Sequence, residues 1–251
     1  MMADAPSSLH RLEFVEQIGS TNAELLERLS RGEALSDGDW LIADRQVAGR
    51  GRLGREWRDG SDNFMGSTVV TMRASDPPAP TLALVAGVAV HRAVASHVAG
   101  PAALTLKWPN DLLLNGAKLA GILLERRGDH VVVGVGVNLV QAPVLVDRQT
   151  VALADLGLDV PRDHFANALA SSFGAELASW RTSGLIETVA RWTTRGPVVG
   201  TPLVVNPATE DRLIGQYRGL DPTGALLLRL AGGTDRAIHA GEVELLRNEE
   251  D

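Results

Sequence analysis

The chain has 251 residues, of which 45% are hydrophobic, and it carries 24 Lys and Arg against 31 Asp and Glu, a net charge of −7. This size allows one large domain and one small one. The absence of cysteine excludes disulfides, thiolate catalysis and cysteine-based zinc sites, and the acidic balance disfavours a nucleic-acid partner. The longest apolar run, residues 82–90, is too short to span a bilayer. We therefore expect a cytoplasmic protein with no membrane partner.

The N-terminal part predicts a strand followed by a helix. Residues 12–18 alternate between apolar and polar side chains, as a half-buried strand does. Thr21 and Glu24 have capping-box spacing, so a helix is expected to begin there and to end before Gly32. Ser20, Thr21 and Asn22 are three successive small hydrogen-bonding residues, which is more than a cap requires. Capping and ligand contact are both open interpretations of this triplet.

A predicted strand at residues 39–46 leads into a segment in which glycine alternates with arginine. We call residues 49–57 the arginine loop; it contains Gly49, Arg50, Gly51, Arg52, Gly54, Arg55 and Trp57. Glycines allow a ligand to approach the backbone, and guanidinium groups suit phosphate and carboxylate oxygens. On an acidic chain this is a local anion-binding site. The loop also spells G-x-G-x-x-G, but no helical pattern follows over residues 55–66, so we reject a dinucleotide-binding fold.

The middle of the chain predicts a strand at 63–72, a connector at 74–80, a buried helix at 81–98 and a short strand at 104–106. After this strand, Trp108-Pro109 requires an extended or turning backbone. The turn presents Asn110 and Asp111 at a strand end.

The next segments predict a hairpin. Asn115-Gly116 suits a type I′ turn between residues 112–114 and 117–125. Lys118 lies in this otherwise apolar second strand, where it either points into a polar cavity or snorkels outward. A further strand at 130–138 carries Gly134 and Gly136 on one face, which leaves a smooth floor for a flat group.

The C-terminal part predicts two amphipathic helices, at 163–181 and 183–195, and then a boundary rich in glycine and proline. Short strands follow at 203–205, 213–220, 225–230 and 238–246, as in a small β-barrel. We therefore predict one domain at 12–197 and a second at 198–248.

Several of these stretches together resemble the biotin–protein ligases. They are Ser20-Thr21-Asn22, Gln46 with the arginine loop, Lys107 to Asp111 with Lys118 to Ile122, and Gly134 to Asn138. The resemblance extends from about residue 12 to the C-terminus. It implies an α+β fold: a mixed, mainly antiparallel sheet with flanking helices, like that of class II aminoacyl-tRNA synthetases, and a small C-terminal SH3-like barrel.

The resemblance also implies a reaction in two steps. The carboxylate of biotin attacks the α-phosphate of ATP, giving biotinyl-5′-AMP and pyrophosphate, with Mg²⁺ bound mainly through the ATP phosphates. A lysine of a biotin carboxyl carrier protein, a subunit of acetyl-CoA carboxylase, then attacks the mixed anhydride. A homodimer is compatible with the resemblance. Because only about eleven residues precede the first predicted strand, we expect no operator-binding domain and no specific DNA partner.

The resemblance assigns roles to individual residues. The catalytic residues are Lys118 and Arg52, which would hold the carboxylate and the α-phosphate together, and Asp111, which would orient the incoming lysine. The biotin-binding residues are Ser20, Thr21, Asn22, Gln46, Gly49, Arg50, Gly51, Arg52, Lys118, Gly134 and Gly136. The ATP-binding residues are Arg50, Arg52, Arg55, Trp57, Asn110, Lys118 and Asn138.

Two other functions compete with this interpretation. A lipoate–protein ligase would use the same two-step chemistry, but the arginine loop and Lys107 to Asp111 argue against it. A non-catalytic module that binds biotin or a nucleotide would keep the pocket but would not need Lys118.

Overall fold

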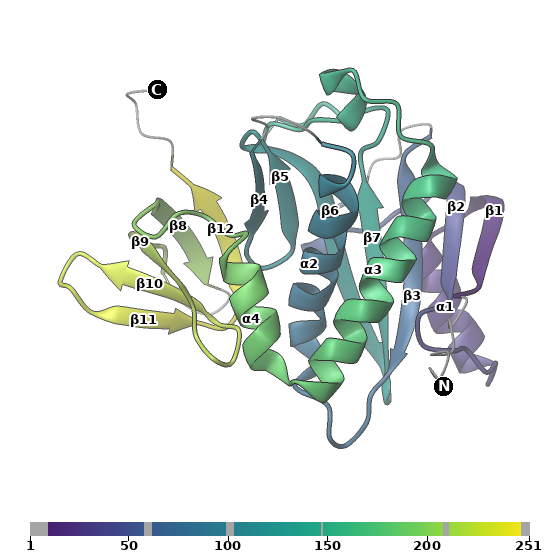
Figure 1. The fold of residues 1–251 in the computed structure, drawn as a ribbon, viewed down its shortest axis with the longest axis horizontal. Coiled ribbons are helices and arrows are strands. Elements are labelled where there is room, and N and C mark those ends of the chain that lie inside the picture. The colour runs from purple at the N-terminus through teal and green to yellow at the C-terminus, as the bar shows by residue number, and fades with distance from the viewer. Residues whose placement is uncertain (1–9, 58–61, 99–102, 147, 208–210, 247–251) are drawn as a thin grey trace, which may run out of the picture.

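A seven-stranded mixed sheet organises the larger part of the chain (Figure 1). The computed structural model describes residues 10–57, 62–98, 103–146, 148–207 and 211–246. The strand order is β1-β2-β3-β7-β6-β5-β4. The strands are β1 Leu12–Ile18, β2 Trp40–Gln46, β3 Phe64–Thr71, β4 Leu104–Lys107, β5 Asp111–Leu114, β6 Ala117–Arg127 and β7 His130–Val137. Only β1 and β2 pair in parallel, which confirms the expected mainly antiparallel sheet.

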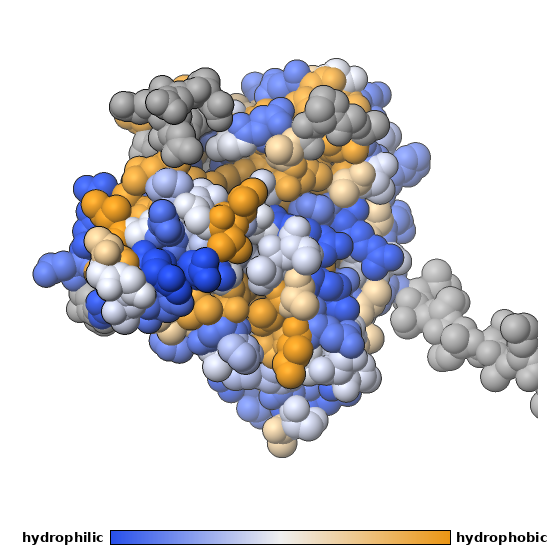
Figure 2. Space-filling model, turned by 60° about the vertical axis from the view of Figure 1, so that its left-hand side comes forward, coloured by the Kyte–Doolittle hydropathy of each residue, from blue (hydrophilic) through white to orange (hydrophobic). Residues whose placement is uncertain are grey.

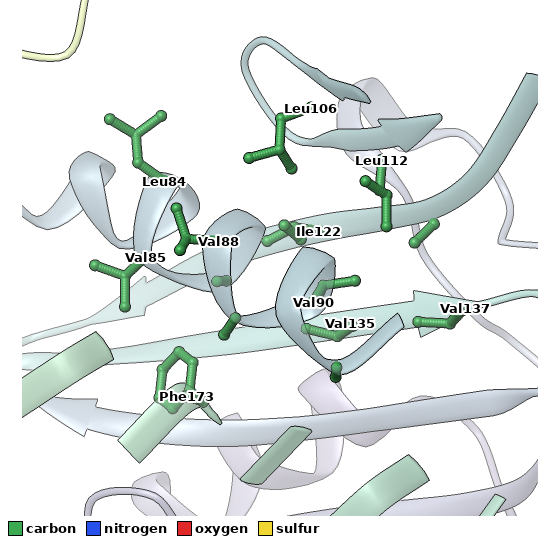
Figure 3. Packing of buried hydrophobic residues seen from close by; sticks show 14 of the residues in the cluster. Leu84, Val85, Val88, Val90, Leu106, Leu112, Ile122, Val135, Val137 and Phe173 are labelled. Atoms are coloured by element: carbon green, nitrogen blue, oxygen red, sulfur yellow. The ribbon is translucent and has the colours of Figure 1, made fainter. Parts of the chain in front are cut away.

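Helices cover both faces of this sheet. They are α1 Thr21–Ser30, α2 Leu82–Ala95, α3 Arg162–Thr182 and α4 Leu185–Thr193, with short 3₁₀ turns at η1 Arg52–Gly54, η2 Ala79–Thr81 and η3 Leu153–Leu156. The Ala- and Val-rich α2 packs on β6 and β7 beside Phe173 of α3 (Figure 3). A separate cluster of Leu25, Leu41, Val69 and Val132 joins α1 to the opposite face. Both faces of the sheet thus carry packed helices over part of their area, so a ligand site must use a part of the sheet that these helices leave uncovered, together with the loops.

The N-terminus of α1 differs in detail from the prediction. The N-cap is Ser20, whose side chain accepts a hydrogen bond from the Ala23 backbone N–H. Thr21 is the first helical residue, and both its backbone N–H and its hydroxyl lie within hydrogen-bond distance of Gln46 Oε1. The predicted capping box of Thr21 and Glu24 is therefore wrong by one residue, because Gln46 of β2 engages Thr21.

The hairpin prediction is confirmed by the backbone angles. Asn115 and Gly116 have φ values of 50° and 80°, and Leu114 pairs with Ala117 across the two-residue turn. Both central residues of a type I′ turn need positive φ. The turn sets the register of β5 against β6, and so places Lys118 opposite Leu113, two residues from Asp111.

The C-terminal part is a five-stranded antiparallel sheet of order β11-β10-β9-β8-β12. Its strands are β8 Pro202–Pro207, β9 Leu213–Leu220, β10 Leu226–Leu230, β11 Asp235–Ile238 and β12 Gly241–Leu245. This confirms the predicted small β-structure, although the hydrogen bonds between the described strands do not close it into a barrel. The domain boundary between residues 197 and 198 stays a prediction.

The surface on the side of this second sheet is mixed in character. Figure 2 shows hydrophilic and apolar residues side by side on that face, with an extended apolar region across its upper part. Among the described residues, no helix has the length and apolar content that crossing a membrane requires.

Candidate active site

One cavity of ≈ 460 Å³ gathers almost all of the predicted site residues. It is lined by the N-terminus of α1, the arginine loop, the β4–β5 turn, the middle of β6 and β7, and Glu242 to Glu244 of β12. The predicted residues in the lining are Ser20, Thr21, Asn22, Gln46, Arg50, Gly51, Arg52, Arg55, Trp57, Asn110, Asp111, Lys118, Gly134, Gly136 and Asn138. Gly49 is not in the lining, so the predicted contact of Gly49 with biotin lacks support from the cavity.

The arginine loop is a small hairpin. Gly51 N–H donates to Arg55 O at 2.7 Å, and Trp57 N–H donates to Gly49 O at 3.0 Å. Leu53 and Gly54 turn the chain with φ values of 57° and 73°. A Cβ at Gly49 would lie 2.7 Å from the Trp57 carbonyl oxygen, so glycine is required there for the two arms to close. Among the described residues, no α-helix lies between the loop and β3, as is expected of a loop that is not a dinucleotide-binding turn.

The glycine floor of β7 is covered by two side chains of the protein itself. A Cβ at Gly134 would lie 2.3 Å from Asn22 Oδ1, and one at Gly136 would lie 2.3 Å from the ring of Trp57. The prediction of a smooth surface is correct, but in this structure the flat group resting on Gly136 is Trp57. Any ligand that occupies the same place must displace the indole and, with it, the end of the arginine loop.

Lys118 points into the cavity. Its Nζ lies 2.6 Å from Asp111 Oδ1 and 5.8 Å from the centre of the Trp57 ring, and its side chain is only 17% exposed. Lys107 reaches the other oxygen of the same carboxylate at 3.2 Å. The inward orientation is therefore the correct one of the two that the sequence left open, and Asp111 holds two ammonium groups at one wall of the cavity.

Asp111 is kept ionised by these two lysines. Burial raises the pKa of Asp111, but Lys118 and Lys107 outweigh that effect by charge and by hydrogen bonding, so the pKa lies below the ordinary value of 3.8. An ionised carboxylate only accepts hydrogen bonds. Asp111 can thus position an ammonium or amine group, as the sequence-based prediction for it requires.

Two arginines of the arginine loop, Arg52 and Arg55, are held by groups of the protein itself. Arg52 donates to Asn110 Oδ1 at 2.9 Å and to Gly241 O at 3.2 Å, and Arg55 forms an ion pair with Glu242 at 2.6 Å. Hydrogen bonding to Arg55 lowers the pKa of Glu242 despite partial burial. The C-terminal sheet therefore contacts the arginine loop directly, and anionic ligands would have to compete with Glu242 for Arg55.

A row of hydrogen-bonded polar groups begins in the cavity lining, at Thr21, Asn22 and Gln46, and continues outside the lining to Ser67 and Glu125. Thr21 N–H donates to Gln46 Oε1 at 2.7 Å, and Ser67 Oγ lies 2.6 Å from both Thr21 Oγ1 and Asn22 Oδ1. Asn22 Nδ2 donates to Glu125 Oε2 at 2.8 Å. These groups are neutral apart from Glu125, and they suit a ligand with several amide-like donors and acceptors.

Asn138 carries an unsatisfied acceptor in the same cavity. Its Nδ2 donates to Val151 O at 3.1 Å and lies 3.4 Å from Lys118 O. Its Oδ1 is buried and has no hydrogen-bond partner among the described residues. Such groups are rare in folded proteins, but this oxygen is closed off from the open part of the cavity, so a ligand N–H could reach it only after neighbouring side chains move.

Sequence reasoning missed Ser67, Glu125 and Glu242. Ser67 is fully buried in β3, Glu125 lies on β6 beyond the stretch from Lys118 to Ile122, and Glu242 lies on β12, which carries no recognisable motif. A serine in an apolar strand and a charged residue at the end of another are weak signals. Only the strand order β3-β7-β6 and the approach of β12 to the arginine loop bring these residues to the site.

Comparisons with known proteins identify the family to which the chain is similar. The Biotin/lipoate A/B protein ligase family matches residues 14–138, and the Biotin protein ligase C terminal domain matches residues 206–246. The chain is 40% identical to the biotin--[acetyl-CoA-carboxylase] ligase of Mycobacterium tuberculosis over 248 residues, covering 97% of this chain and 92% of that one. It is 33% identical to the bifunctional ligase/repressor BirA of Escherichia coli, covering 91% of this chain and 72% of that one.

A solved structure agrees over almost the whole chain. The biotin protein ligase from Aquifex aeolicus in complex with biotin and ATP superimposes with a TM-score of 0.82 and 26% identity, covering 95% of this chain and 99% of that one. The fold, the two family matches and the 40% identity to a ligase over almost the whole chain all support one assignment. The chain belongs to the biotin–protein ligase family.

Proposed function

We propose that this chain is a biotin–[biotin carboxyl carrier protein] ligase, which forms biotinyl-5′-AMP from biotin and ATP and transfers the biotinyl group to a lysine. The observation that carries the proposal is the composition of one cavity. It joins Lys118 and the arginines of the arginine loop to a wall of neutral polar groups. The cations suit a carboxylate and a triphosphate, and the polar wall suits the ureido ring of biotin.

The first step brings two anions together, so catalysis depends on charge neutralisation and positioning. Lys118 and Arg52 hold the carboxylate and the α-phosphate in contact while the carboxylate oxygen attacks phosphorus and pyrophosphate leaves. Arg55 and Arg50 hold the remaining phosphates. Charge-assisted hydrogen bonds of this kind contribute roughly 1.5–3 kcal/mol each.

Mg²⁺ fits this site through the nucleotide. The acidic side chains of the cavity wall that carry ion pairs are Asp111, held by two lysines, and Glu242, held by Arg55. They are therefore poorly placed to bind the ion in this arrangement. Bound to the phosphates, Mg²⁺ would supply further neutralisation of their charge.

The nucleotide base is expected at Asn138 and Trp57. Asn138 and Trp57 both line the cavity, and Asn110 lies next to Arg52. The indole of Trp57 would cover the adenine, and Asn138 and Asn110 would lie near the nucleotide.

In the second step the lysine of the carrier domain attacks the carbonyl carbon of the mixed anhydride, and AMP leaves. Asp111, ionised at neutral pH, orients the incoming amine. The relatives named biotin--[acetyl-CoA-carboxylase] ligase support the carrier subunit of acetyl-CoA carboxylase as the partner.

The decisive experiment is ATP–pyrophosphate exchange with purified protein. Exchange that depends on biotin, and that lipoate does not support, is the expected result. Exchange with lipoate would indicate a lipoate ligase, and biotin binding without exchange would indicate a non-catalytic module. Transfer of biotin to a purified carrier domain then tests the second step.

The arginine loop is expected to change its dynamics when ligands bind. A group on Gly136 must displace Trp57, and anions must replace Glu242 as the partner of Arg55. We predict faster amide hydrogen exchange over residues 48–57 in the free protein and slower exchange with biotin and ATP bound. Amides that exchange equally slowly in both states would contradict this prediction. The amides of β10 provide an internal reference that should not change.

We predict no sequence-specific binding to DNA. The net charge is −7, and the densest cluster of arginines, Arg50, Arg52 and Arg55, lines the cavity. Weak binding at low salt should fall steeply as salt increases and should be displaced by ATP. Binding to one duplex that resists salt and is enhanced by biotin and ATP would contradict the prediction. The homodimer and the cytoplasmic location stay predictions as well.

A further inference from the structure

We propose that Glu125 is a positioning residue for biotin recognition, acting through Asn22. The proposal rests on the assignment of the polar wall to biotin. Glu125 lies on β6 and is not part of the cavity lining, whereas Asn22 is. Its carboxylate accepts the hydrogen bond from Asn22 Nδ2 at 2.8 Å, between residues that are 103 positions apart in the sequence.

The fold brings these residues together across three strands. Ser67 of β3 pairs with Gly134 of β7, and Gly134 pairs with Leu123 of β6. Asn22 extends from the N-terminus of α1 over Gly134, where a Cβ would lie 2.3 Å from its Oδ1. The absent side chain at position 134 leaves the room that lets Asn22 reach both Ser67 and Glu125. Asn22 itself is 3% exposed, so its amide must be satisfied inside the protein.

The charge of Glu125 determines which way the Asn22 amide faces. An ionised carboxylate has no proton to donate, so it must meet the NH₂ group of Asn22 and not its oxygen. Asn22 Oδ1 then faces Ser67 and accepts its hydroxyl proton at 2.6 Å. Without Glu125, the two ends of the amide would be exchangeable, and the wall would present a mixture of donors and acceptors to the ligand.

The same constraint passes to Thr21. Once Ser67 donates its single proton to Asn22, the Thr21 hydroxyl, 2.6 Å away, must donate to Ser67. Gln46 Oε1 still has a partner, because it accepts from Thr21 N–H at 2.7 Å. One carboxylate therefore orients a row of hydrogen bonds from Glu125 to Thr21. Biotin's ureido group has two N–H donors and one carbonyl acceptor. A wall whose hydrogen-bond donors and acceptors have fixed positions therefore favours one orientation of the bound biotin over the others.

The link from Glu125 to Arg50 is secondary. The two charges are 4.0 Å apart, and the Arg50 side chain is 60% exposed, so solvent weakens their attraction. We therefore assign the effect of Glu125 to Asn22 and not to the arginine loop. Loss of Glu125 is therefore expected to weaken the binding of biotin and to leave the binding of ATP largely unchanged.

The test compares Glu125→Leu and Glu125→Gln with the wild type. We expect Glu125→Leu to raise both the Kd and the KM for biotin by about tenfold, with the KM for ATP within about twofold of wild type. Glu125→Gln should recover only part of the loss, because its Oε1 can still accept from Asn22 but its NH₂ group can also donate to the Asn22 oxygen, so the amide orientation is no longer fixed. Glu13→Leu is the matched control: Glu13 is a similarly exposed strand carboxylate (31% against 26%) that is paired with Arg28, outside the cavity. It should leave both KM values unchanged.

A double-mutant cycle separates positioning from general damage. In an Asn22→Ala background, Glu125→Leu should add little further loss of biotin affinity, measured by calorimetry, because the partner through which it acts is gone. Additive losses, or equal changes in the KM for biotin and for ATP, would overturn the proposal. Wild-type protein that fails to bind biotin would instead refute the biotin site itself. Unchanged biotin affinity in Glu125→Leu would refute only the role of Glu125.

Discussion

Replacement of Lys118 by alanine is expected to lower biotin-dependent ATP–pyrophosphate exchange by about 10²- to 10³-fold, the usual cost of removing one preorganised group that meets developing charge. Lys118 points into the cavity from the apolar first part of β6. Its ammonium group contacts Asp111 and faces the space beside the Trp57 ring. The interaction of Lys118 with the carboxylate of biotin and the α-phosphate of ATP becomes stronger as negative charge moves between these two groups in the transition state. The loss should therefore appear mainly in kcat and less in the KM for biotin.

The fold should survive this substitution. Asp111 keeps its second partner, Lys107, at 3.2 Å, so the buried carboxylate is not left without a cation. We expect a decrease in thermal stability too small to account for the lost activity. A Lys118→Ala protein that is folded and exchanges pyrophosphate near the wild-type rate would remove Lys118 from the mechanism. An unfolded variant would be replaced by Lys118→Met, which retains most of the apolar stem.

Replacement of Arg52 by glycine is expected to release the adenylate more than it blocks its formation. Arg52 is anchored by Asn110 Oδ1 and Gly241 O, and it can grip the intermediate from the side of the arginine loop. Loss of one charge-assisted contact, roughly 1.5–3 kcal/mol, corresponds to release about 10- to 100-fold faster. Free biotinyl-AMP would then acylate lysines of bystander proteins such as serum albumin.

Two measurements together check this prediction: the rate at which labelled biotinyl-AMP leaves the protein, and the labelling of a bystander protein. Arg31→Gly is a suitable control, because Arg31 pairs with Glu27 on the exposed side of α1 and should affect neither. If Arg52→Gly makes no adenylate and labels nothing, Arg52 is required for the first step and not for retention of its product. Labelling that stays confined to the carrier lysine would contradict the proposed grip.

The sequence alone determined the features that depend on neighbouring residues. Alternation and helical periodicity identified the strands and helices, because they reflect which side of each element is buried. Asn115-Gly116 specified its turn, since both residues tolerate positive φ. The arginine loop marked the site as a local cluster of positive charge on an acidic chain. Lys118 marked it because a charged side chain is costly in an apolar stretch unless it faces a polar cavity. Together with the family resemblance, these signals predicted the site residues, of which only Gly49 lies outside the cavity lining.

Only the tertiary structure decided which distant groups complete the site. Glu125 reaches Asn22 across 103 residues, and Arg55 reaches Glu242 across 187. Such pairs depend on strand order, on register and on how the second sheet approaches the first, and none of these is a property of a short segment. The position of Trp57 on Gly136 and the cap at Ser20 in place of Thr21 have the same origin. In each case a partner from another strand offered a hydrogen bond or a packing surface stronger than the local preference.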